Sequence, residues 1–150
     1  MSVGYRLTLA GDIRLEDVAA LVAPDATEGR TRSGARTLTA ARYEDLGYVV
    51  DIIGGTHGYY EADDDGGSLW VWEPNVYVDV SFHMLKDTLL EQGEPNVMKA
   101  VAHVLAGRTE DAALVFNGNT LMLTRFAGEL LVHNAAQWYN HDYDHILAPS

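Results

Sequence analysis

Hydrophobic and polar positions change their period along the chain, and the period separates strand segments from helical ones. Residues 3–10 alternate apolar and polar side chains, which is typical of a half-buried strand. Over residues 13–23 the apolar side chains recur at helical spacing, with Leu15, Val18 and Val22 on one face. The same rules predict strands at 38–43, 48–53, 69–72 and 76–83, and a second helix at 95–106.

Residues 112–134 predict three short strands joined by two tight turns. Asn117-Gly118, or equally Gly118-Asn119, is a two-residue hairpin signal, and Ala127-Gly128 is a weaker second turn. The resulting core face carries Leu114, Phe116, Leu121, Leu123, Leu130 and Val132. The opposite face carries Val115, Met122, Thr124, Leu131 and His133. This second face is too apolar for solvent, so we expect a helix, another strand or a partner to cover it.

The order of these elements predicts an α+β fold: an antiparallel or mixed β-sheet with two helices packed on it and a C-terminal three-stranded meander. The 150 residues fit one domain, residues 1–150. No apolar run approaches the ~20 residues that span a bilayer, and the first residues lack the pattern of a signal peptide. The chain has no cysteine, which excludes disulfides and thiolate zinc sites. We therefore expect a cytoplasmic protein with no membrane partner.

The formal net charge of −12 is unevenly distributed along the chain. Residues 1–42 carry +1, whereas residues 43–150 carry −13. This field disfavours nucleic acid as a partner and favours a basic protein, mainly by speeding their encounter. A charge that serves only solubility is the simpler alternative.

Three short patterns contain residue types that are used in catalysis or metal binding. Asp79, Ser81 and His83 are the residue types of a nucleophilic triad, but they share one face of one strand, where their spacing of ~6.6 Å is too long for a relay. His141 and His145 nearly match a zinc motif, with Asp142 in place of its glutamate. Residues 61–66 resemble the start of a calcium loop, but its twelfth position is a tryptophan, so we expect an exposed acidic hairpin tip instead. We assign no cofactor and no bound metal.

The acidic middle of the chain is the predicted contact region for a partner. Aromatic side chains beside charged ones are typical of interface hot spots. The residues predicted to contact the partner are Tyr59, Tyr60, Glu61, Asp63, Asp64, Asp65 and Glu73. The sequence gives no preference between an interface position and a core position for the tryptophans at 70 and 72.

Two parts of the chain resemble the swarming-inhibition (Sit-type) immunity proteins of bacterial toxin systems. The first is Tyr5-Arg-Leu-Thr-Leu9 with the helical segment 15–22. The second comprises 111–118, 121–125, 128–134 and Trp138, while residues 43–93 match nothing in the family. The resemblance implies a non-catalytic protein that binds and neutralises a cognate protein toxin, which the charge of this chain predicts to be basic.

Two other functions stay open at this point. One is a small metal-dependent hydrolase that uses His141 and His145. The other is a self-associating structural module, a homodimer formed through the face that carries Val115, Met122 and Leu131.

Overall fold

The computed structural model of the protein describes residues 2–85 and 92–147. Its strands are β1 (Ser2–Ala10), β2 (Thr27–Arg30), β3 (Arg36–Arg42), β4 (Tyr48–Thr56), β5 (Tyr60–Asp63), β6 (Leu69–Trp72), β7 (Val76–Leu85), β8 (Ala112–Phe116), β9 (Thr120–Phe126) and β10 (Glu129–Val132). Its α-helices are α1 (Leu15–Val22), α2 (Glu94–Gly107), α3 (Ala135–Trp138) and α4 (Asp144–Leu147). Short 3-10 turns, η1 (Asp65–Gly67) and η4 (His141–Tyr143), follow β5 and α3.

All ten strands belong to one sheet. Nine of them follow the order β2-β3-β4-β7-β1-β8-β9-β5-β6, and β10 pairs with β9. The pairs are antiparallel except for one parallel bridge, between Asp63 of β5 and Thr120 of β9. At the centre, Leu7 of β1 lies opposite Val80 of β7 and Leu114 of β8. The two central neighbours of β1 therefore come from distant parts of the chain.

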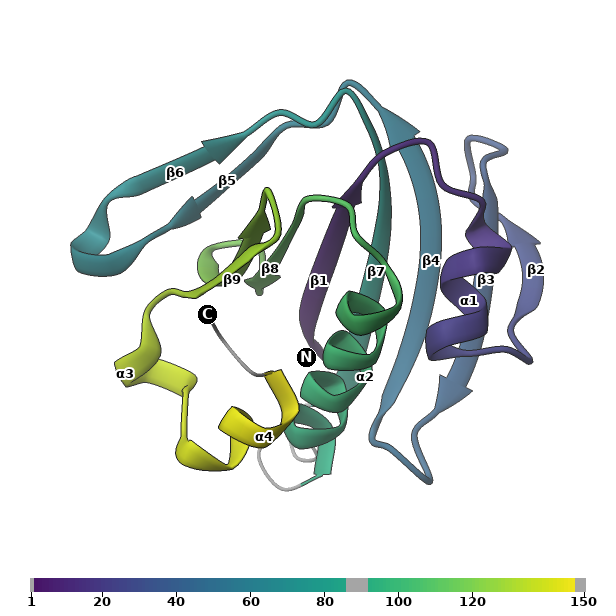
Figure 1. The fold of residues 1–150 in the computed structure, drawn as a ribbon. Helices are drawn as coiled ribbons and strands as arrows, with labels where there is room; N and C mark the ends of the chain where they lie inside the picture. Colours follow the sequence, from purple (N-terminus) through teal and green to yellow (C-terminus); the bar gives the residue numbers. More distant parts are fainter. Residues whose placement is uncertain (1, 86–91, 148–150) are drawn as a thin grey trace.

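The main core lies between the sheet and the helices. Helices α1 and α2 lie side by side on one face of the sheet, and α4 packs beside α2 (Figure 1). Val18 of α1 and Val101 of α2 are fully buried there, together with Leu9, Ile52 and Val80 from the strands. No helix among the described residues is long and apolar enough to cross a membrane.

The predicted fold class is wrong. The structure has a ten-stranded sheet that dominates the molecule, and the described residues form four helices, of which α3 and α4 have four residues each. Strand β2 lies in a polar segment for which no strand was predicted, and β5 lies in the acidic stretch. Strands β8, β9 and β10 pair in succession, but they do not end the sheet as a separate meander, because β9 also contacts β5. Strands β2 and β5 have four residues each, which is too short a window for their periodicity to distinguish them from a loop.

The predicted assignment of side chains to the two faces of β8 and β9 is partly wrong, because the turn is longer than predicted and β9 contains a bulge. The turn after β8 has three residues, 117–119, so Phe116 lies opposite Thr120. Val115 then pairs with Leu121, whereas Leu114 pairs with Leu123, and the extra residue is Met122. Because a one-residue slip exchanges the faces of a strand, Leu121 leaves the predicted core face and Met122 joins the main core.

Candidate functional site

The hairpin formed by β5 and β6 is the element that covers the second face of β8 and β9. It extends from the top of β4 and β7 across β8 and β9 (Figure 1). Its inner side chains Ala62, Trp70 and Trp72 pack with Ala113, Val115 and Leu121 in a second buried cluster. The expected cover is thus another strand pair of this chain. Trp70 and Trp72 pack against this cluster, so they belong to the core and not to the interface.

The opposite side of the hairpin faces solvent, and we call it the outer hairpin face. The strand register places Glu61 opposite Val71 and Asp63 opposite Leu69. Leu69 is 65% exposed and Val71 43%, which is unusual for apolar side chains in a strand. The outer hairpin face comprises Tyr59, Glu61, Asp63, Leu69, Val71 and Glu73. It combines three carboxylates with three exposed hydrophobic side chains.

At the base of this face, Tyr59 and Glu61 form a local pair. Tyr59 is 57% exposed, and its hydroxyl donates a hydrogen bond to a carboxylate oxygen of Glu61. That bond, with the charges of Glu61 and Glu73, raises the pKa of Tyr59. The ring is therefore held beside the acidic groups as a neutral phenol.

Tyr60 does not lie on the outer hairpin face, although it was predicted to contact the partner. It is only 7% exposed, and its hydroxyl donates to Asp79 with an O–O distance of 2.9 Å. Asp79 also accepts a hydrogen bond of 2.5 Å from Thr8, and the guanidinium of Arg6 lies 4.6 Å from the Tyr60 ring centroid. Burial raises the pKa of Asp79, and the bonds from Thr8 and Tyr60 oppose that rise. Tyr60 thus fastens the base of the hairpin to β1 and β7.

At the tip, a group of hydrogen bonds that we call the hairpin clasp joins the hairpin to the chain after β10. His133 Nδ1 lies 2.8 Å from Asp64 Oδ1, and the Asn134 N–H donates to Asp65 Oδ1 at 2.7 Å. The Asn134 side-chain amide donates to the carbonyls of Asp63 and Leu121, both at 2.9 Å. The clasp comprises Asp63, Asp64, Asp65, His133 and Asn134. Gly66 and Gly67, with φ of 71° and 81°, allow the chain to reverse just beyond it.

The partners of His133 in and beside the clasp indicate which of its ring nitrogens carries the hydrogen. An ionised carboxylate can only accept, so Nδ1 donates to Asp64, and in the neutral ring Nε2 accepts from the buried hydroxyl of Thr124 at 2.8 Å. Partial burial alone would raise the pKa of Asp64, but the bonds from the Asp65 N–H and from His133 outweigh it and hold that pKa below its usual value.

The same atoms are the nearest approach to a metal site in the described part of the chain. One ligand atom each from Asp64, Asp65 and His133 lie within 4.8 Å of one another. Both ring nitrogens of His133 and one oxygen of each carboxylate already hold hydrogen bonds within the protein. The arrangement therefore serves as an anchor for the tip.

The residues of the triad-like pattern and of the zinc-like pattern do not form a catalytic or metal-binding arrangement in the described structure. Asp79 is held by Thr8 and Tyr60, whereas His83 Nε2 lies 3.4 Å from Asp51 on the neighbouring strand. His141 and His145 are exposed in η4 and α4, and His141 Nδ1 lies 3.5 Å from Asp144. Among the described residues, neither histidine belongs to a group of three or more side chains that could hold a metal ion.

The face proposed for self-association is also not available as a surface. Val115 and Met122 are buried beneath the hairpin and in the main core, respectively, and only Leu131 remains exposed. A homodimer formed through these three side chains would require the hairpin to detach.

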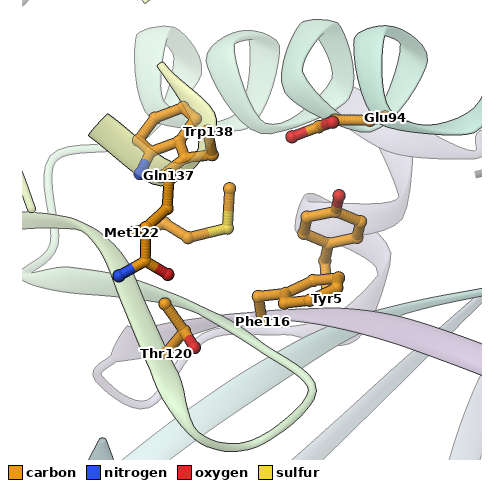
Figure 2. Close-up of a pocket in the computed structure, with 7 residues that line it drawn as sticks. All are labelled: Tyr5, Glu94, Phe116, Thr120, Met122, Gln137 and Trp138. Atoms are coloured by element: carbon orange, nitrogen blue, oxygen red, sulfur yellow. The ribbon is translucent and has the colours of Figure 1, made fainter. Parts of the chain in front are cut away.

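One small cavity could not be predicted from local sequence, because its lining residues come from several elements. It measures about 210 Å³ and is lined by Tyr5, Glu94, Phe116, Thr120, Met122, Gln137 and Trp138. Figure 2 shows the Glu94 carboxylate and the Tyr5 hydroxyl facing each other at one side. Burial raises the pKa of Glu94, which the hydrogen bond from Tyr5 partly offsets. The volume is below the range of about 300–1,000 Å³ that is usual for ligand pockets.

The charge around the outer hairpin face is uniformly negative along the chain that builds it. Residues 43–85 contain nine acidic side chains and neither lysine nor arginine. They supply β4 to β7, so these four strands carry no cation of their own except for histidine. Such a field raises the local concentration of a basic partner.

Comparison with known families decides the lineage of the chain. A family model described as SitI3-like matches residues 3–143. The chain belongs to the SitI3-like family. The match includes the segment 43–93, which showed no resemblance in the sequence analysis, and it confirms the resemblance to Sit-type immunity proteins. No curated protein and no solved structure matches the chain.

Membership of the SitI3-like family points to a toxin immunity protein, a class that is typically non-catalytic. Of the seven predicted contact residues, the structure places Tyr59, Glu61, Asp63 and Glu73 together on the outer hairpin face. Asp64 and Asp65 lie at its tip within the clasp, and Tyr60 is buried. Leu69 and Val71 lie on the same face but were missed, because their exposure depends on which side of the hairpin packs inward.

Proposed function

We propose that this SitI3-like protein is an immunity protein that binds a cognate bacterial toxin domain and blocks its activity without catalysis. The outer hairpin face, with Asp65 at its tip, is the proposed contact surface. The observation that supports this choice is the co-location of exposed Leu69, Val71 and Tyr59 with three carboxylates. Apolar side chains beside charge are typical of protein interfaces, whereas a solvated strand face carries polar groups.

The anchoring of the hairpin supports the same proposal. Its inner tryptophans, the clasp at its tip and the Tyr60–Asp79 bond at its base fix the hairpin before any partner arrives. A surface that is already ordered loses less conformational entropy on binding. The negative field of residues 43–85 favours a basic toxin domain and accelerates its association.

The function is tested by neutralisation of a toxin. The tagged full-length chain is used to recover a co-purifying toxin domain from its native cells, and that domain is then expressed with and without the chain. We expect co-expression to restore growth. A chain that binds no toxin domain, or that binds one without restoring growth, would contradict the proposal.

The contact surface is tested by two matched triple variants. Glu61→Gln, Asp63→Asn and Glu73→Gln remove three charges from the outer hairpin face. Glu44→Gln, Asp45→Asn and Asp142→Asn remove three exposed charges elsewhere. We expect the first set to slow association with the toxin by about tenfold at low salt and to flatten its salt dependence. Equal slowing by both sets would assign the effect to net charge and remove the proposed surface.

A further inference from the structure

Strand β6 ends the sheet, and its outward edge is open among the described residues. Its one partner strand is β5, and no strand follows it in the sheet order. An edge of this kind presents main-chain donors and acceptors that can pair with an added strand. The residues of β6 decide whether this edge is protected from such pairing.

The hydrogen-bond pattern identifies which residues point outward. The Asp64 N–H donates to the Ser68 carbonyl at 2.7 Å, so this pair is a bonded pair of the antiparallel ladder. Bonded and non-bonded pairs alternate, so Trp70 and Trp72 direct their N–H and C=O groups to β5. Leu69 and Val71 therefore direct theirs to the open edge. On the other strand, the Asp63 N–H donates away from β6 to Asn119 at 2.7 Å, as the same alternation requires.

The two ends of the sheet differ in how they discourage pairing. Strand β2, at the opposite end, carries Glu28 and Arg30, and Glu28 is paired with Arg36 at 2.8 Å. Charges on an edge strand are a common protection against added strands. Strand β6 has the sequence Leu-Trp-Val-Trp, with no charge and no proline. Its edge thus lacks both of these protections.

We propose that β6 accepts an extended, basic segment of the partner protein as an additional antiparallel strand, paired to the main chain of Leu69 and Val71. The identity of that partner as a toxin rests on the proposed function. Charge favours a basic segment over a second copy of this chain, because a second copy would bring its own Glu61, Asp63 and Glu73 to a face that already carries three carboxylates. Main-chain pairing then supplies affinity, and the flanking carboxylates select the charge of the added strand.

The direct test uses the full-length chain and a blocked nonapeptide in which lysine and valine alternate. We expect saturating peptide to slow hydrogen exchange at the amides of Leu69 and Val71 by about tenfold or more, with little change at Trp70 and Trp72, which already bond to β5. The same peptide with all its amides N-methylated keeps its charge, but its methyl groups remove the donors and hold its main chain away from the edge, so it should give no protection. Unchanged exchange at Leu69 and Val71, or equal protection by both peptides, would overturn the proposal.

A variant separates this inference from the proposed function. Val71→Pro removes one outward donor without breaking a bond to β5, and Val71→Thr keeps the donor as a control. We expect the proline variant to lose peptide binding and toxin neutralisation, whereas the threonine variant keeps peptide binding, which depends on the main-chain donor. If Val71→Pro neutralises the toxin as wild type does, the proposal of strand addition is wrong and the proposed immunity function is retained.

If the peptide adds at β6 but the wild-type protein neutralises no toxin, the proposed immunity function is wrong and the edge of β6 is still an acceptor for a basic strand. Concentration-dependent dimerisation that Val71→Pro abolishes would assign the edge to a second copy and overturn the proposal.

Discussion

The Nδ1 atom of His133 lies 2.8 Å from a carboxylate oxygen of Asp64, although 69 positions separate the two residues in the chain. Through this contact the tip of an acidic hairpin is joined to the segment that follows the last strand. The outer hairpin face therefore belongs to an ordered surface, held at its tip by the clasp and at its base by Tyr60. Its order depends in part on His133, Asn134 and Tyr60, which do not belong to the outer hairpin face.

Removal of the imidazole should loosen the tip of the hairpin. His133→Ala leaves Asp64 and the buried hydroxyl of Thr124 without their shared partner, so we expect the free energy of unfolding to fall by about 1–3 kcal/mol. His145→Ala removes an exposed imidazole and should change stability by less than about 0.5 kcal/mol. Urea denaturation followed by tryptophan fluorescence measures both. Equal stability of the two variants would show that the clasp contributes nothing.

The clasp should also make stability depend on acid. The folded pKa of Asp64 lies below its unfolded value, so its contribution is complete above the unfolded pKa of about 4 and is lost as pH falls through the folded value. Asp64→Asn cannot titrate. The stability difference between wild type and this variant should therefore shrink between about pH 7 and about pH 3 in urea denaturation. A difference that stays constant over that range would contradict this assignment.

Loss of the Tyr60 hydroxyl should give a defect that is greatest near neutral pH. Tyr60→Phe removes a donor from ionised Asp79 and should destabilise the protein by about 1–2 kcal/mol. The folded pKa of Asp79 already lies above its unfolded value, so the folded state binds this proton more tightly and is favoured as pH falls. The defect should therefore diminish in acid, as judged by urea denaturation across pH. Tyr59→Phe, on the exposed face, should show neither effect.

Burial predicts different costs for leucines on two neighbouring strands, β9 and β10. Leu121 is fully buried beneath the hairpin, so Leu121→Ala should lower the free energy of unfolding by about 2–5 kcal/mol. Leu131 is 44% exposed, so Leu131→Ala should cost less than about 1 kcal/mol. Thermal and urea denaturation would distinguish them. Similar losses at both positions would contradict the burial of Leu121 beneath the hairpin.

Local patterns were reliable where an element is long and packs through its own periodicity. The helical spacing of residues 95–106 and its flanking Pro95 and Gly107 predicted α2, which runs from Glu94 to Gly107. The alternation in residues 76–83 predicted β7, with Val78, Val80 and Phe82 buried. In these segments the burial of one face is encoded by consecutive residues, so a single window contains the evidence.

The candidate site was only partly predictable for the opposite reason. The acidic residues of 59–73 were identified as a contact region, but the burial of Tyr60 depends on Asp79 and Thr8, which lie on other strands. The exposure of Leu69 and Val71 depends on the inward packing of Trp70 and Trp72 against β8 and β9. Either side of β6 is apolar enough to be buried, so the composition of this strand alone does not determine its orientation.

The sequence by itself determined the lineage, the negative charge of residues 43–150 and the long elements, because each is a property of composition or of neighbouring residues. Only the tertiary structure decided the ten-stranded sheet, the bulge at Met122 and the position of the hairpin over β8 and β9. These features depend on pairing between distant segments, as in the single bridge from Asp63 to Thr120 and the bond from His133 to Asp64. Such pairing is selected by which apolar faces the complete chain can bury together, and no local window contains that information.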